Sequence, residues 1–170
     1  MSLFAKPRFA REKVEFYAAR YSYGKEEAVS ALVPTIRARG FLTLQDLAIV
    51  GDWKSPRIRS RLAQNDDKAV REVTRLALAS SSIRLAVHVP QVLTGVGMPV
   101  ASTLLHWFHR DSFPILDFRA LWSLGVEPQL YTLDFWERYV TATRSLAESW
   151  EVDMRTLDKA LWQYSAEHQP

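Results

Sequence analysis

Cysteine is absent from this chain of 170 residues. That absence excludes disulfides, thiolate metal sites, iron–sulfur clusters and cysteine nucleophiles together, and it is typical of a reducing compartment. No signal peptide is recognisable, so we expect a cytoplasmic protein. Histidine is scarce as well, with four residues and no HExxH-like spacing, although His106 and His109 lie one helical turn apart. We expect no metal and no cofactor.

Strand-like alternation, internal repeats and low-complexity linkers are also lacking, so the chain reads as helices nearly throughout. Residues 85–108 carry no formal charge over a length that would span a membrane, but prolines and glycines interrupt them. A continuous membrane-spanning helix does not tolerate that pattern. The sequence therefore predicts a buried helical hairpin here, no membrane partner, and an all-α, two-lobed single domain over residues 1–170.

Helix boundaries follow from caps, glycines and prolines. Thr43 and Asp46 form a predicted capping box, and Gly51-Asp52 is expected to end that helix. In the helix that follows Asp66, the predicted inner face holds Val70, Val73, Leu76 and Ala77. The expected helices cover 12–23, 26–39 with a bend or split at Pro34, 43–50, 57–64, 67–79, 83–93, 99–110, 118–124, 133–149 and 154–167.

Net charge is only +3, but it is unevenly distributed. Residues 53–84 hold many more basic than acidic side chains, whereas acids outnumber bases after Gly125. This asymmetry suggests that one face turns to a polyanion, with the arginines between 57 and 75 supplying affinity that does not depend on sequence. The alternative is an ordinary solvated helix surface that is rich in arginine.

A glycine turn between two apolar helices, Gly95-Val96-Gly97, is the most informative stretch. Leu93 and Val96 are expected to anchor it, while the two glycines permit positive φ and close approach. The backbone amides of the turn and of Met98, Val100 and Ala101 would then face one phosphate at the start of a helix. The alternative is a tight helix–helix turn that binds nothing.

An aspartate follows the turn in the run Phe113-Pro114-Ile115-Leu116-Asp117 and precedes a short predicted helix that Gly125 ends. A carboxylate at a helix start is held still and kept ionised by backbone N–H groups and the helix dipole. Such a group can stabilise positive charge that builds on a sugar when its base departs. The alternative is a helix cap without chemistry.

Together, the turn and the aspartate resemble the helix-hairpin-helix superfamily of DNA base-excision glycosylases, which includes endonuclease III. Gly95 and Gly97 match the hairpin glycines, Ala101 matches a small residue that follows them, and Leu116-Asp117 matches the Val-Asp pair of the family. The resemblance implies that Asp117 is the catalytic acid and that double-stranded DNA is the partner. Gly95, Val96, Gly97, Met98 and Val100 would bind its backbone.

The sequence also departs from that family. Pro99 stands where bifunctional members carry a Schiff-base lysine, the iron–sulfur cluster is absent, and Phe118-Arg119 replaces the usual Thr-His or Thr-Asn after the acid. These differences predict a monofunctional glycosylase without lyase activity. Lys54, Arg57 and Arg61 are the expected additional DNA contacts, and Trp53, Trp107 and Trp122 are candidates either for a base pocket or for the core. The alternatives are a nucleic-acid-binding module without catalysis and an interaction protein that retains the fold.

Overall fold

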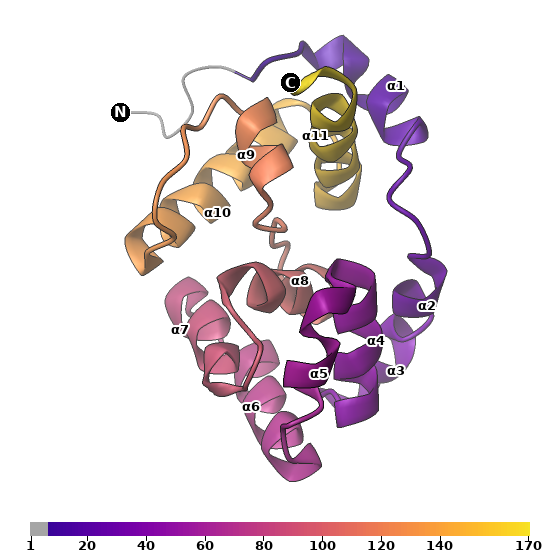
Figure 1. The fold of residues 1–170 in the computed structure, drawn as a ribbon. Helices are drawn as coiled ribbons and strands as arrows, with labels where there is room; N and C mark the ends of the chain where they lie inside the picture. The colour runs from indigo at the N-terminus through magenta and orange to yellow at the C-terminus, as the bar shows by residue number, and fades with distance from the viewer. Residues whose placement is uncertain (1–6) are drawn as a thin grey trace. The chain divides into compact units, whose positions relative to one another are not determined.

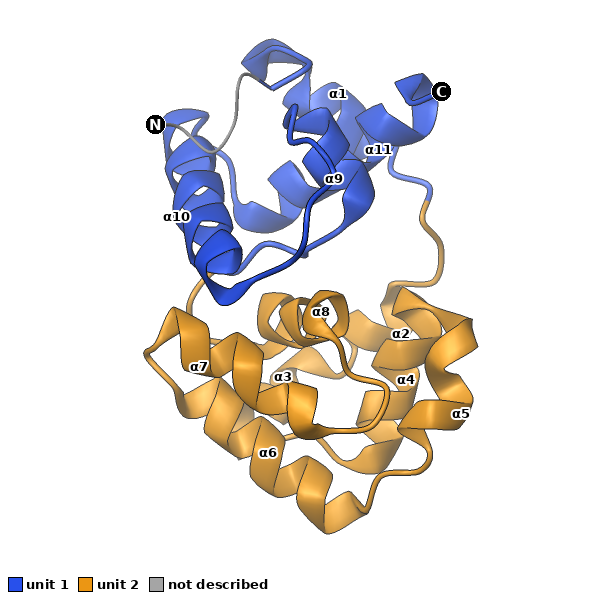
Figure 2. Cartoon of the chain, turned by 60° about the vertical axis from the view of Figure 1, so that its left-hand side comes forward, with its two compact units in different colours: residues 1–22, 113–170 blue, residues 23–112 orange. Residues whose placement is uncertain are grey.

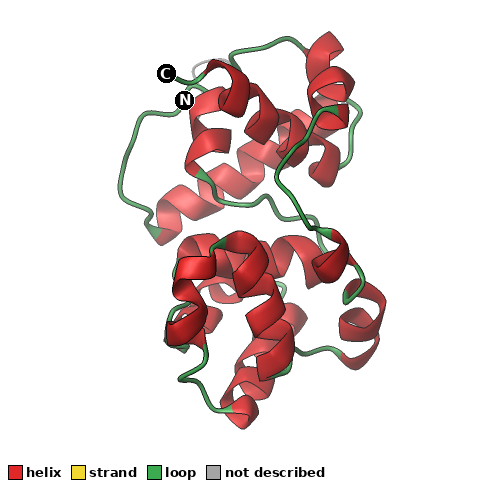
Figure 3. Cartoon of the chain, turned by 45° about the vertical axis from the view of Figure 1, so that its right-hand side comes forward, coloured by secondary structure: helices red, strands yellow, loops and turns green. Residues whose placement is uncertain are grey.

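The protein is all-α, as the sequence predicts. A computed structural model describes residues 7–170, and no strand occurs within that range (Figure 3). The chain divides into two compact units: unit 1 comprises residues 1–22 and 113–170, and unit 2 comprises residues 23–112 (Figure 2). The single domain predicted over 1–170 includes residues 1–6, which lie outside the described residues.

Unit 2 contains the glycine turn and the whole basic segment of residues 53–84. Its longest helices are α4, α6 and α8, and the turn directly precedes α8 (Figure 1). Its elements are α2 (Glu27–Ser30), α3 (Val33–Arg39), α4 (Leu44–Lys54), the 3-10 helix η2 (Pro56–Ile58), α5 (Arg59–Leu62), α6 (Asp67–Ala79), α7 (Ile83–His88), the 3-10 helix η3 (Val89–Val92) and α8 (Met98–Phe108).

The predicted helix over 26–39 is split, as its internal proline suggests. Pro34 is the second residue of α3, where the missing N–H costs little. Gly40 ends α3 with φ of +79°, the left-handed conformation that favours glycine. The capping box of Thr43 and Asp46 is confirmed: the Thr43 hydroxyl accepts from the Asp46 N–H, and the Asp46 carboxylate accepts from the Thr43 N–H.

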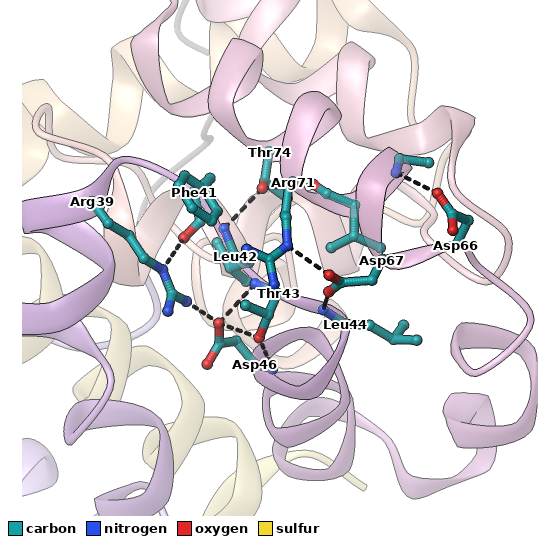
Figure 4. Close-up of polar contacts among 12 residues, drawn as sticks. Arg39, Phe41, Leu42, Thr43, Leu44, Asp46, Asp66, Asp67, Arg71 and Thr74 are labelled. Carbon is teal, nitrogen blue, oxygen red and sulfur yellow. Dashed lines mark hydrogen bonds and ion pairs between the residues drawn. The ribbon is translucent and has the colours of Figure 1, made fainter.

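A polar network joins the end of α3 to the starts of α4 and α6 (Figure 4). The Arg39 guanidinium donates to the Phe41 carbonyl and pairs with Asp46. The Asp67 carboxylate accepts from the Leu44 N–H at 2.8 Å and from Arg71 Nε at 2.6 Å. These two hydrogen bonds lower the pKa of Asp67 below its usual value.

The expected helix break at Gly51-Asp52 is wrong, because α4 continues to Lys54. Gly51 is buried, and a Cβ at that position would collide with Leu62 Cδ1. Gly51 is therefore explained by close packing of α4 on α5 rather than by chain reversal. Glycine costs a helix interior only about 1 kcal/mol relative to alanine, which tertiary packing overrides here.

The predicted inner face of α6 is also partly wrong. Val70 and Ala77 are buried as expected, but Leu76 is 64% exposed and Thr74 takes the place in the core. Position 76 lies about 120° around the helix from position 70, so it turns away from the buried stripe. The Thr74 hydroxyl donates to the Val70 carbonyl and accepts from the Leu42 N–H, which satisfies this polar group in the interior.

Unit 1 packs around the last helix. Its elements are η1 (Arg11–Lys13), α1 (Val14–Ala19), α9 (Phe118–Ser123), α10 (Leu133–Ser149) and α11 (Met154–His168). Both α1 and α9 contact α11, and the Ser123 hydroxyl donates to the Leu161 carbonyl at 2.6 Å. Among the described residues, no helix has the length and apolar character needed to cross a membrane.

Candidate nucleic-acid interface

The glycine turn lies between η3 and α8 in unit 2, and α7 packs on α8. Leu93 and Val96 are buried, and the Val96 N–H donates to the Leu93 carbonyl at 3.1 Å, so both anchor the turn as predicted. Gly95 has φ of +84°. Gly97 has φ of −92° and ψ of 178°, so the prediction of positive φ holds for Gly95 and is wrong for Gly97.

The two glycines meet different requirements. A Cβ on Gly95 would lie 3.0 Å from Arg61 Cβ and 3.2 Å from the Leu62 backbone nitrogen, so this glycine allows the turn to pack on α5. A Cβ on Gly97 would meet nothing closer than Pro99 Cδ at 3.8 Å, and Gly97 is exposed. Neither sterics nor φ within the described residues therefore require glycine at position 97.

Unused backbone donors gather where α8 begins. Among the described residues, the N–H groups of Gly97, Met98 and Val100 donate no hydrogen bond, while the Met98 and Val100 side chains are buried. The Val96 N–H donates to the Leu93 carbonyl at 3.1 Å and the Ala101 N–H to the Gly97 carbonyl at 2.9 Å, so the expectation that these two amides face outward is wrong. The helix takes up the Ala101 donor because Gly97 is the residue immediately before α8.

Asn65 fixes the turn from outside it, a role that sequence reasoning missed. Its Nδ2 donates to the Thr94 carbonyl at 2.9 Å, and its Oδ1 accepts from the Thr94 N–H at 2.8 Å. Nδ2 also donates to the Leu62 carbonyl at the end of α5. The Asn-Asp pair before α6 indicates a helix cap, but nothing local indicates a partner 29 residues away.

The predicted basic contacts take different positions around this turn. Arg61 is exposed on α5, and its Cβ lies beside Gly95, so the turn and this arginine belong to one surface. Arg57 is exposed on η2. Lys54 is half-buried at the end of α4. Arg59, which lies between Arg57 and Arg61 in the sequence, forms a bidentate pair with Asp52 at 2.6 and 2.7 Å.

Two of the three candidate pocket tryptophans form an aromatic cluster in unit 2. Trp53 is buried and packs edge-to-face on both Tyr23 and Trp107, with ring centroids 5.4 and 5.7 Å apart. A hollow of about 540 Å³ borders Trp53 and the Asp52–Arg59 pair. The third tryptophan, Trp122 in unit 1, stacks on Tyr164 and lies under the Arg8 guanidinium.

His106 lies in the last turn of α8, and His109 directly follows that helix. The Asp111 N–H donates to His109 Nδ1 at 2.9 Å, so Nδ1 acts as an acceptor and Nε2 carries the proton that it donates to the Ser80 carbonyl. His109 is buried, and His106 packs edge-to-face on Trp107. Within residues 7–170, no group of three or more potential ligands suits a metal ion.

Asp117 lies in unit 1, where it caps α9. Its Oδ1 accepts from the Arg119 N–H at 2.9 Å, and Gly125 follows the helix with φ of +70°, so both predicted ends of this helix are confirmed. Burial raises the pKa of Tyr131 and, more strongly, that of Tyr139, and the negative charge of Asp117 raises both further. Asp117 is half-buried, and both phenols remain protonated at neutral pH.

No protein-family model matches the chain, and no match was found among curated proteins or solved structures.

Proposed function

We propose that this chain is a DNA-binding protein that resembles a monofunctional base-excision glycosylase. Unit 2 binds the phosphate backbone of double-stranded DNA through the turn at Gly95, Val96 and Gly97 and the first residues of α8. Asp117 in unit 1 is the candidate catalytic acid. Pro99 lies at the position of the lyase lysine in the family that the sequence resembles, so the proposed activity is base release without strand cleavage.

The observation that carries the binding proposal is the combination of unused donors and a cation on one surface. The N–H groups of Gly97, Met98 and Val100 are available in the first turn of an eleven-residue helix, and Arg61 lies beside Gly95. Backbone N–H groups at a helix start favour phosphate, and a neighbouring guanidinium adds a charge-assisted contact. Neither feature reads bases, so the expected affinity is independent of sequence.

The catalytic part of the proposal follows from the chemistry of a fixed carboxylate. Removal of a base builds positive charge on the deoxyribose, and an aspartate held near that carbon stabilises the cation and orients the attacking water. The hydrogen bond from the Arg119 N–H fixes Asp117, which is half-buried. Held in this way, the Asp117 carboxylate keeps one orientation.

The binding proposal is tested by the affinity of wild type and Gly97→Val for an undamaged duplex. The substitution adds a side chain where the protein itself leaves room, so the fold is retained while a phosphate is kept away from the amides. We expect weaker binding with a loss of about 1 kcal/mol in stability, as expected for a less suitable N-cap residue. Equal affinity for both proteins would contradict the proposal. Arg138→Gln, which removes an exposed charge of unit 1, is the control for net charge.

A second candidate function is a nucleic-acid-binding module without catalysis. The observation that favours it is that N-capping alone accounts for an aspartate at position 117. In that case DNA binding depends on the turn in the same way, and no base is released from any damaged duplex. The remaining alternative is an interaction protein that retains the fold. A measurable duplex affinity that is lost in Gly97→Val would argue against it.

A further inference from the structure

Unit 2 contains a second cationic feature, a hollow of about 350 Å³. Four arginines line it: Arg37, Arg39, Arg75 and Arg110. No acidic side chain is among the lining residues. The volume lies within the range of about 300–1,000 Å³ that is usual for small-molecule sites.

The charge around this hollow is only partly balanced. Asp46 pairs with Arg39, and Asp111 lies 4.0 Å from Arg110. Arg37 donates to the Trp107 carbonyl, and neither Arg37 nor Arg75 forms an ion pair within the described residues. Two guanidinium groups at the hollow are thus left without a carboxylate.

The Phe41 ring, next to the hollow, contacts three guanidinium groups. The guanidinium of Arg75 lies 4.6 Å from the centre of the Phe41 ring, that of Arg39 lies 5.2 Å from it, and that of Arg71 lies 5.5 Å from it. A cation–π contact of this kind stabilises each guanidinium group by only about 0.5–1 kcal/mol, whereas the guanidinium groups repel one another. Figure 4 shows Arg39 and Arg71 held in place by their aspartates.

Helix dipoles offset part of the positive charge around the hollow. The carboxyl-terminal ends of α3, α6 and α8 all border the hollow, and each carries about half a negative charge at most. Three such ends offset about one and a half charges and the carboxylates of Asp46 and Asp111 offset two more, so the four guanidinium groups retain about half a positive charge. A surplus of positive charge therefore remains, and it surrounds apolar side chains: Ile36 and Phe108 are buried, and Leu78 is half-buried.

The hollow is separate from the glycine turn. Asn65, directly before α6, holds Thr94 of the turn, whereas Leu78 and Ala79 at the other end of α6 line the hollow. In the same way α8 begins at the turn and ends at Phe108 in the hollow. Eleven residues of helix cover about 16 Å, so the two features lie at opposite ends of both helices.

We propose that this hollow binds a small organic anion that carries a phosphate or carboxylate on an apolar body. The apolar body lies on Leu78 and Ala79, and the anionic group accepts hydrogen bonds from Arg75 and Arg37 at the rim. Guanidinium groups match the oxygen geometry of phosphate and carboxylate with paired donors. This site is independent of the proposed DNA surface, and it stands if that proposal fails.

The probe for this site is 1-naphthyl phosphate, titrated calorimetrically into the full chain, with inorganic phosphate and 1-naphthol as half-ligands. We expect one molecule per chain, bound more tightly than either half-ligand. Arg75→Gln should weaken it about tenfold, which is the loss expected for one charge-assisted contact. Arg138→Gln, an exposed arginine on α10 in unit 1, is the matched control and should leave the affinity unchanged.

Three outcomes would overturn the proposal: no binding, equal affinity of wild type and Arg75→Gln, or 1-naphthol binding as tightly as its phosphate. Arg37→Gln repeats the test at the other exposed arginine that contacts the anion, should Arg75→Gln fold poorly. A saturating duplex should leave the probe bound. Displacement of the probe by that duplex would place the hollow on the DNA surface and contradict a separate site.

Discussion

The side-chain amide of Asn65 holds Thr94 through both of its polar atoms, accepting from its N–H at 2.8 Å and donating to its carbonyl at 2.9 Å. Asn65→Ala should therefore lower the free energy of unfolding by about 1–2 kcal/mol and weaken duplex binding, because the turn loses its attachment to α5. Asn65→Asp keeps the acceptor and removes the donor. Denaturant titration should place it between wild type and Asn65→Ala, and equal stabilities of all three would contradict this role.

The two turn glycines should respond differently to alanine. Gly95→Ala forces a Cβ into a left-handed residue and against the Leu62 backbone, so we expect a loss of about 2 kcal/mol in stability. Gly97→Ala should cost less than about 1 kcal/mol, as expected for alanine in place of glycine at an N-cap. Chemical unfolding of both variants measures the contrast, and the reverse order would show that the turn has a different conformation.

Duplex binding should fall with salt, and Arg61 should contribute to that dependence. Each neutralised phosphate adds about 0.9 to the slope of log affinity against log salt. Arg61→Gln should lower the slope by about one, because Arg61 lies beside the turn. Anisotropy titrations at several salt concentrations measure it. A slope for Arg61→Gln that equals the wild-type slope, or an equal reduction in Arg138→Gln, would speak against a local contact.

Unit 1 should lose stability at alkaline pH through Tyr139. Burial raises the pKa of Tyr139 well above 10.0, and Asp158 and Asp117 raise it further. The resulting stability is fully present below about pH 10, the pKa of the unfolded tyrosine, and is lost as pH rises toward the folded value. Thermal melts between pH 8 and 11 should therefore fall more steeply for wild type than for Tyr139→Phe.

That variant also loses the hydrogen bond from the Tyr139 hydroxyl to the Ile115 carbonyl, so we expect it to start about 1 kcal/mol less stable at neutral pH. The two curves should converge as pH rises above 10. Parallel curves over the whole range would contradict the assigned pKa direction.

Asp117 variants separate capping from chemistry. Asparagine still accepts from the Arg119 N–H, so Asp117→Asn should keep both stability and duplex affinity, while Asp117→Ala should lose about 1 kcal/mol. On a damaged duplex from which wild type releases a base, both variants should release none, as measured by alkaline cleavage of the abasic product. Full base release by Asp117→Asn would rule out catalysis by this carboxylate.

Much of this fold was predictable from the sequence, because helix caps and helical periodicity depend on residues that are close together in the chain. The capping box at Thr43, the left-handed Gly40 and Gly125, and the full extent of α10 follow from cap chemistry and helical periodicity. The role of Gly51 was not predictable. A glycine that ends a helix and a glycine that makes room for a neighbouring leucine have the same sequence pattern, and only the position of Leu62 distinguishes them.

The candidate site was predictable only in part for the same reason. The run around Gly95 and Gly97 indicated the turn, and the arginines indicated a basic surface. The attachment of the turn to Asn65 and the packing of Gly95 on α5 are tertiary contacts without a local pattern. Arg61 lies beside the turn, whereas Arg75 lines the hollow. This separation follows from the direction of α6 in the folded protein and could not be predicted from the sequence.

The most direct test of the central claim compares the affinity of the protein for two duplexes at the same low salt by fluorescence anisotropy. One duplex is undamaged, and the other carries a cationic abasic-sugar analogue that mimics the charge of the transition state. The account predicts measurable binding to both and much tighter binding to the analogue, with Asp117→Asn removing the difference. Equal affinity for the two duplexes would contradict a glycosylase-like site and leave the turn as a contact with the backbone alone.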